Sequence, residues 1–165
     1  MFHSILVSYD GSPDSRQALD QAIDLAQSEN ARLTVLTAVR SVPFAALSSS
    51  GASAVGELEQ ELAQEAEANV HEAASQVPAN LPVTMIVSYK PIGPTLIEQI
   101  DQADHDLLIM GSRGRGPIRS TLLGSTSHFA LNHSPVPVLI VHERRTDRDA
   151  GADESSRDRP LAAQQ

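Results

Sequence analysis

The chain contains no cysteine and only one lysine, Lys90, among its 165 residues. Without cysteine it cannot form disulfides, use a thiolate nucleophile or build a zinc site with cysteine ligands, which fits a reducing compartment. No stretch approaches the run of about 18 apolar residues that marks a membrane-spanning helix, and the apolar run at the N-terminus is too short for a secretory signal. We therefore expect a cytoplasmic protein with no membrane partner.

Positive charge is also scarce. The chain has 12 Lys and Arg residues against 21 Asp and Glu residues, a formal net charge of −9. Such a surface repels the phosphates of nucleic acid, so we expect no nucleic-acid partner. Residues 1–143 hold seven of the basic residues, and three of these, Arg113, Arg115 and Arg119, lie within seven positions of one another. Cations concentrated in one segment of an acidic chain indicate a local site for an anion.

Several catalytic and metal-binding patterns are missing. No Gly-x-Ser-x-Gly elbow is present, and no lysine follows a glycine-rich turn as a Walker loop requires. The histidines show no spacing typical of metal ligands. They are His3, His71, His105, His128, His133 and His142.

Short apolar segments alternate with helical patterns along a chain of one domain's length. Strands are expected at residues 3–9, 33–39, 83–87, 106–110 and 136–141. Helices are expected after the Ser12–Pro13 cap, over 57–77, from Pro94, and up to about Asn132, with Pro135 beyond it. This alternation predicts an α/β fold in which a parallel sheet carries helices on both faces.

Three further segments have distinct compositions. Residues 40–56 lose all periodicity and are expected to form a long loop. The helix expected over 57–77 carries glutamates in its early turns, where the helix dipole favours negative charge. Residues 144–165 contain five basic and five acidic residues and little apolar material, so we expect a disordered tail.

The segment 106–126 places an apolar strand before a glycine-rich turn. Because Gly111, Gly114 and Gly116 have no Cβ, the backbone can take a positive φ and approach a ligand, with amide N–H groups directed at an anion. The triplet 124–126 adds a glycine and two hydroxyl donors at a helix start. These two halves predict a polyphosphate site. The alternative is a flexible turn that uses glycine for conformational reasons only.

The spacing of this segment resembles the ATP-binding branch of the universal stress protein family. The pattern consists of Gly111, two residues, Gly114, nine residues, Gly124–Ser125 and the apolar run 134–141. Residues 5–12 are also similar to that family's first strand and turn. The resemblance covers residues 1–143 and implies one nucleotide-binding domain of the doubly wound, adenine nucleotide alpha-hydrolase-like kind, with strand order 3-2-1-4-5.

The resemblance also implies the residues that contact the nucleotide. Asp10 would bind the ribose or an ATP-bound Mg²⁺ or Mn²⁺ ion, the alternative being that it caps the following helix. The end of the second strand would touch the base. Thr126 departs from the valine frequent in the family, which should not disturb a backbone contact. The full set of expected contacts is Ser8, Asp10, Ala38, Val39, Met110, Gly111, Arg113, Gly114, Arg115, Gly124, Ser125 and Thr126.

We therefore expect an ATP-binding protein of the stress response whose nucleotide is a regulatory or structural ligand with at most slow hydrolysis. Residues Pro135 to Val141 would form an apolar edge strand, and such edges invite pairing with a second copy, so we expect a homodimer. One alternative is a dimeric interaction module of the same fold that binds no nucleotide. Another is an enzyme on a related nucleotide-binding sheet, such as an adenylyl-transferring or flavin-associated protein.

Overall fold

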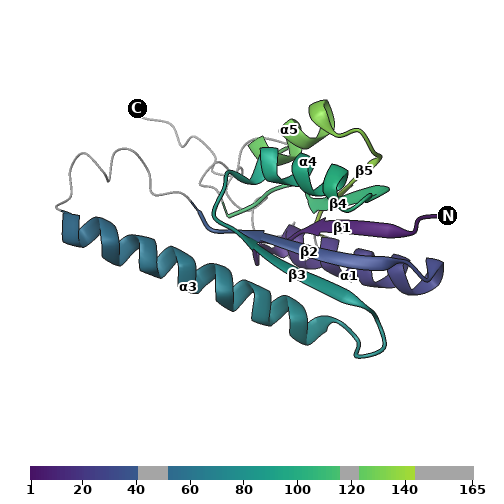
Figure 1. Ribbon diagram of the computed structural model, residues 1–165, viewed down its shortest axis with the longest axis horizontal. Coiled ribbons are helices and arrows are strands. Elements are labelled where there is room, and N and C mark those ends of the chain that lie inside the picture. Colours follow the sequence, from purple (N-terminus) through teal and green to yellow (C-terminus); the bar gives the residue numbers. More distant parts are fainter. Residues whose placement is uncertain (41–51, 116–122, 144–165) are drawn as a thin grey trace, which may run out of the picture.

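The computed structural model describes residues 1–40, 52–115 and 123–143. Five parallel strands form one sheet in the order β3-β2-β1-β4-β5 (Figure 1). The strands are β1 (Ser4–Ser8), β2 (Arg32–Ala38), β3 (Val83–Ser88), β4 (Leu107–Gly111) and β5 (Val138–Val141). The helices are α1 (Pro13–Glu29), α3 (Ala52–Gln76), α4 (Ile92–Gln102) and α5 (Ser125–His133). The expected fold and strand order are confirmed.

Helices cover both faces of the sheet. Helices α1 and α3 lie on one face, and α4 and α5 lie on the other (Figure 1). Along β1, Ile5 and Val7 belong to the core on the α1 side, whereas Leu6 belongs to the core on the α4 and α5 side. All three side chains are fully buried. Because both faces are covered, this strand reads as a continuous apolar run in the sequence.

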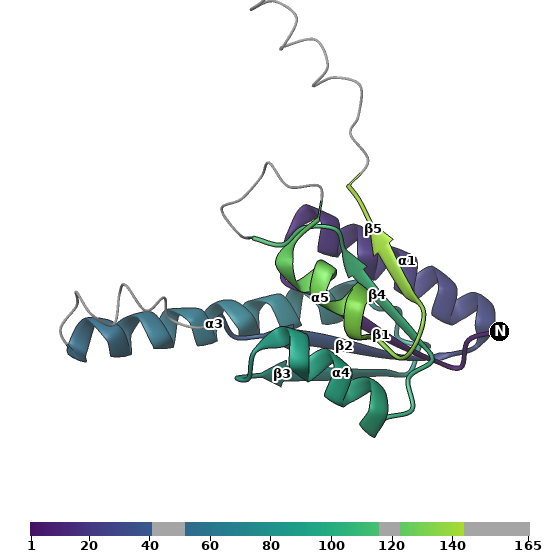
Figure 2. The same cartoon turned by 90° about the horizontal axis from the view of Figure 1, so that it is seen from above.

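The long helix α3 differs from its expected extent. It begins at Ala52, so the expectation that the loop continues to residue 56 is wrong, while residues 41–51 lie outside the described part. No acidic residue falls in its first turn, so the dipole interpretation of the glutamates is also wrong. Figures 1 and 2 show the amino-terminal part of α3 projecting beyond the sheet. This part of α3 packs on no core, so its sequence needs no regular spacing of apolar residues. For this reason the spacing of apolar residues did not predict where the helix begins.

Strand β5 is shorter than expected and begins at Val138, not at residue 136. Pro135 and Pro137 have no amide N–H to donate to a neighbouring strand, so regular strand pairing begins only after them. The carbonyl of Pro137 already accepts a hydrogen bond from Leu108 N at 3.0 Å. The adjacent β4 extends one residue further than expected, to Gly111, which pairs with Val141.

None of the helices in the described ranges is long and apolar enough to cross a membrane. The expected disordered tail, residues 144–165, lies outside these ranges.

The strands that matter most for a ligand are β1 and β4, which are neighbours in the sheet although about a hundred residues separate them. Strand order reverses between them, and ligands of such sheets bind beyond the carboxyl ends of the strands at that point.

At the opposite, amino-terminal edge of the sheet lies a buried histidine, His105. Its Nδ1 is 2.8 Å from Ser4 Oγ, whereas its Nε2 has no hydrogen-bond partner among the described residues. Burial lowers the pKa of His105 below its ordinary value of 6.5. The contact with Ser4 and the Asp106 carboxylate raise this pKa, and the positive charge of Arg32 lowers it, so burial decides the direction. The folded protein therefore favours the neutral imidazole.

Folding stability is expected to fall as the pH drops below about 6.5, because the unfolded chain binds a proton at His105 more readily than the folded chain does. Urea unfolding at about pH 7.5 and about pH 5.5 measures the difference. The substitution His105→Gln should remove much of it, whereas His128→Gln, on the exposed surface of α5, should not. An unchanged pH dependence in His105→Gln would contradict the assignment.

Candidate functional site

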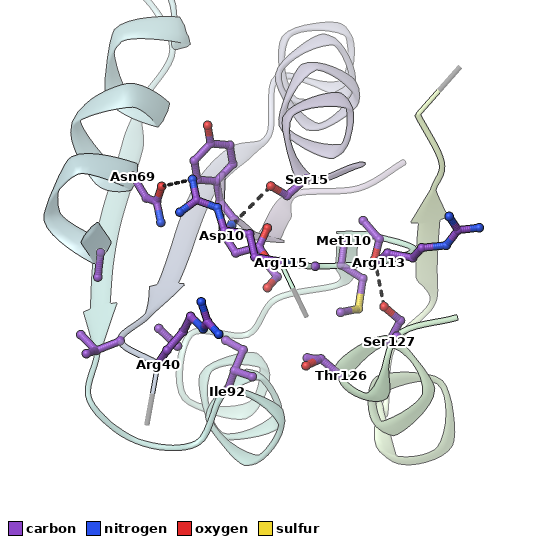
Figure 3. Close-up of a pocket in the computed structure, with 18 of the residues that line it drawn as sticks. Asp10, Ser15, Arg40, Asn69, Ile92, Met110, Arg113, Arg115, Thr126 and Ser127 are labelled. Atoms are coloured by element: carbon purple, nitrogen blue, oxygen red, sulfur yellow. Dashed lines mark hydrogen bonds between the residues drawn. The ribbon is translucent and has the colours of Figure 1, made fainter. Parts of the chain in front are cut away.

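A cavity of about 540 Å³ opens beyond the carboxyl ends of β1, β2 and β4 (Figure 3). This volume is typical of small-molecule sites, which span roughly 300–1,000 Å³. All twelve residues expected to contact a nucleotide line it. The fold therefore brings together residues from three separate parts of the sequence, and their role as ligand contacts remains a prediction.

Ten further residues line the cavity and were not predicted. Four of them, Leu62, Glu65, Ala66 and Asn69, lie along one side of α3 at helical spacing. The apolar periodicity of this helix indicated that it packs on the domain, but the strand order was needed to place it beside β2. The other six are Tyr9, Ser15, Arg40, Pro91, Ile92 and Ser127.

The carboxylate of Asp10 joins the end of β1 to the glycine-rich loop. Its Oδ1 accepts from Ser12 N at 3.0 Å, and its Oδ2 accepts from Arg115 N at 3.1 Å. A Cβ at Gly114 would lie 2.5 Å from Asp10 Oδ2. The α1 cap is Ser12, whose hydroxyl accepts from Ser15 N, so Asp10 does not occupy the capping position.

A second carboxylate, Asp14, holds the same loop from the first turn of α1. Its Oδ2 accepts from the Ser112 hydroxyl and, at 3.1 Å, from Arg113 N. Its Oδ1 accepts from Glu143 N at 3.0 Å, beyond the end of β5. Asp14 does not line the cavity. It therefore connects three chain segments behind the cavity wall.

The glycines of this loop serve close packing rather than an unusual backbone conformation. Among the described glycines only Gly11 has a positive φ, 72°, so the expected positive φ at Gly111 and Gly114 is wrong, and Gly116 lies outside the described part. A Cβ at Gly111 would lie 2.8 Å from backbone atoms of Asp14 and Ser15. Here α1 abuts β4 so tightly that only glycine fits.

Helix α5 begins at the cavity without a side-chain cap. Gly124 is its N-cap residue, and no side-chain hydrogen bond caps the helix there. The amide of Gly124 donates to Ser112 O at 2.7 Å, which holds the helix start against the loop. Ser127 Oγ reinforces this by donating to Gly111 O at 2.9 Å. The first two residues of the helix, Ser125 and Thr126, line the cavity, and the start of a helix carries positive potential.

The two described arginines of the loop point in different directions. The Arg115 guanidinium extends toward Asn69 of α3, and that of Arg113 extends away from Asp10 (Figure 3). Arg40, at the end of β2, is a third cation on the cavity wall. Counted with the carboxylates Asp10 and Glu65, the described lining has more positive than negative side chains although the whole chain is acidic.

Tyr9, on the cavity wall, lies near Arg16 of α1 and Glu72 of α3. Arg16 joins these helices through Nε to Glu72 Oε1 at 2.6 Å, and hydrogen bonding from Arg16 lowers the pKa of Glu72. Burial, followed by the charge of Glu72, raises the pKa of Tyr9. The Tyr9 hydroxyl is near Glu72 and Arg16 but makes no well-formed hydrogen bond with a described residue, and the residue is 1% exposed.

Replacing Tyr9 by phenylalanine is expected to raise the free energy of unfolding by about 1 kcal/mol, because it removes a buried hydroxyl that the fold leaves unpaired. Urea unfolding measures the change, with Tyr89→Phe as the control because Tyr89 is 72% exposed. Destabilisation by Tyr9→Phe would show that the hydroxyl has a partner in solution, such as a bound water.

The sequence and the fold are similar to those of known proteins. The profile of the Universal stress protein family matches residues 1–142. Universal stress protein YxiE of Bacillus subtilis (strain 168) is 31% identical over 148 residues, which cover 86% of this chain and 99% of that protein. A solved universal stress protein in complex with cAMP has a TM-score of 0.62 at 27% identity, with 87% of this chain and 99% of that one covered. A family protein of Arabidopsis thaliana solved with AMP bound has a TM-score of 0.58 at 14% identity, with 94% and 97% covered.

Proposed function

The chain belongs to the universal stress protein family, and we propose that it binds ATP in the cytoplasm as a regulatory ligand of a stress response. The observation that carries the proposal is the uncapped start of α5 on the wall of a cavity of nucleotide size. Backbone amides at a helix start are a ready-made site for phosphate. A related structure, 27% identical, contains cAMP, which supports an adenine nucleotide as the ligand class.

The cavity has two chemically different ends that suit the two ends of a nucleotide. Gly124, Ser125 and Thr126 supply small groups, hydroxyls and helix-start amides for phosphates. Ala38, Val39, Leu62 and Ile92 supply an apolar wall for a base. Val39 N already donates to Ser88 O at 2.8 Å, which leaves the Val39 carbonyl as the group available to an adenine amino group.

The residues present fit a metal ion that arrives with the phosphates. No cluster of three metal-ligating side chains exists in the described residues, so these residues do not build a metal site without a ligand. Mg²⁺ commonly uses one or two carboxylates together with substrate phosphates. Asp10 lines the cavity and keeps lone pairs beyond its two hydrogen bonds, so it would hold Mg²⁺ or Mn²⁺, and the ion would neutralise phosphate charge.

We propose that hydrolysis is at most slow. Phosphoryl transfer needs a group that orients the attacking water and charges that follow the transition state. The described lining contains no histidine or lysine. The carboxylate of Asp10 accepts backbone hydrogen bonds from Ser12 and Arg115 and would also hold the metal ion. The nucleotide would therefore persist as a ligand.

We also propose a homodimer through the edge strand β5. Leu139 of this strand is 41% exposed and Leu131 of the neighbouring helix α5 is 51% exposed. An open parallel edge with exposed apolar side chains favours pairing with a second copy. Light scattering coupled to size-exclusion chromatography should give the mass of a dimer. A monomer at every concentration would overturn this part of the proposal.

The nucleotide itself can be identified directly. The purified protein is denatured, and the released small molecules are separated and quantified. ATP should be recovered from the wild type and reduced in Gly124→Val, whose side chain would enter the space proposed for the phosphates. Gly56→Val, where nothing lies within 4 Å of the added Cβ, should retain it. Failure to bind at millimolar ATP would favour the interaction module, and rapid ADP production would favour an enzyme.

A further inference from the structure

The side chain of Arg115 reaches from the glycine-rich loop to helix α3. Its Nη1 donates to Glu65 Oε1, and its Nη2 donates to Asn69 Oδ1 at 3.4 Å. Figure 3 shows the second of these contacts. The two acceptors precede the arginine by 50 and 46 residues, so the contact joins two elements that only the fold brings together.

The turn that follows β1 leaves space for the side chain of Arg115. Gly11 has a φ of 72°, and a Cβ there would lie 2.6 Å from Arg115 Nη2 and 2.5 Å from Asn69 Oδ1. The guanidinium therefore fills space that any larger residue at position 11 would occupy. At its other end Arg115 is held by Asp10, which accepts from its backbone amide at 3.1 Å.

The same guanidinium is chemically suited to phosphate. Arg115, Glu65 and Asn69 all line the cavity, and the side chains of the ion pair are each 33% exposed. A planar guanidinium binds carboxylate and phosphate in the same bidentate manner. A phosphate group within reach of Arg115 would therefore compete with Glu65 for it, and Glu65 would repel that phosphate.

We propose that Glu65 and Asn69 are specificity-determining residues. By holding the guanidinium of Arg115, they reduce the preference of the cavity for nucleotides with more phosphates. The inference deepens the proposed function and rests on it. Adenosine leaves the ion pair intact, whereas a triphosphate long enough to reach Arg115 must take the guanidinium from Glu65. The ion pair therefore reduces the affinity for ATP and leaves that for adenosine unchanged.

The competition also couples the nucleotide to α3. When a phosphate takes Arg115, Glu65 loses its partner and Asn69 loses a donor, so the contact between the loop and α3 is broken.

Calorimetric titration of adenosine, AMP and ATP tests the inference on four forms of the full chain: wild type, Glu65→Gln, Arg115→Gln and the double variant. Glu65→Gln should raise the affinity for ATP about fivefold and leave that for adenosine within about twofold. Arg115→Gln should lower the affinity for ATP about tenfold. The gain from Glu65→Gln should disappear in the Arg115→Gln background.

Glu61→Gln is the matched control. Glu61 lies one turn before Glu65 on the same helix and is exposed, so it removes the same charge without touching Arg115. If Glu61→Gln raises the ATP affinity as much as Glu65→Gln does, the gain comes from the loss of one negative charge on α3 and not from release of Arg115, and the inference is overturned. Weaker ATP binding by Glu65→Gln, or a gain that persists without Arg115, also overturns it.

The failure of the inference can be distinguished from that of the proposed function. If the wild type binds ATP and Glu65→Gln binds it equally well, only the role of Glu65 is wrong. If the folded wild type binds none of the three ligands at millimolar concentration, the proposed function is wrong and the inference falls with it. Thermal melting of each variant verifies that the titrated protein is folded.

Discussion

An alanine at Gly111 is expected to lower the free energy of unfolding by about 3 kcal/mol, near the upper end of what overpacking usually costs. The new methyl group would lie 2.8 Å from the backbone carbonyl carbon of Asp14 and from the backbone nitrogen of Ser15. Both atoms belong to the start of α1, so relief requires the helix to move away from β4. Urea unfolding followed by circular dichroism gives the change.

The matched control is Gly56→Ala. Gly56 lies inside α3, and nothing lies within 4 Å of the position that a methyl group would take there, so alanine should stabilise the helix by about 0.5–1 kcal/mol. The two substitutions add the same methyl group and should change stability in opposite directions. Equal stability of Gly111→Ala and wild type would show that α1 does not rest on β4 as closely as described.

Aspartate at Thr126 is expected to reduce ATP affinity at least a hundredfold, or about 3 kcal/mol, because it places a carboxylate where phosphate would bind. The same substitution should stabilise the unliganded protein by about 0.3–1 kcal/mol, since an acid in the first turn favours the helix dipole. Thr126 is the second residue of α5, which has no acid in its first turn. Loss of affinity together with a gain of stability excludes misfolding as the cause.

Thr126→Val provides the control for this test. Valine keeps the shape of the side chain and removes only the hydroxyl, so a ligand held by the backbone amide should bind within about threefold of wild type. Titration of ATP into the two variants and wild type makes the comparison. If Thr126→Asp binds ATP normally, phosphates do not lie at the start of α5, and the proposed orientation of the nucleotide is wrong.

Sequence patterns predicted the central strands because burial on both faces leaves a direct record in composition. Ile5, Leu6 and Val7 are apolar without interruption since helices cover both sides of β1. The same reasoning failed at the start of α3, which faces no core and so shows no periodicity. It also did not explain Gly111. Glycine is needed there because α1 lies too close for a Cβ, and this contact produces no pattern in the neighbouring sequence.

The sequence by itself determined the alternation of strands and helices, and the resemblance drawn from its glycine spacing supplied the family, the strand order and all twelve expected residues of the cavity wall. Only the tertiary structure decided that α3 completes that wall and that Arg115 pairs with Glu65. The reason is physical. Secondary structure follows from interactions between residues a few positions apart, whereas a wall built from segments 50 residues apart depends on how the sheet orders its strands.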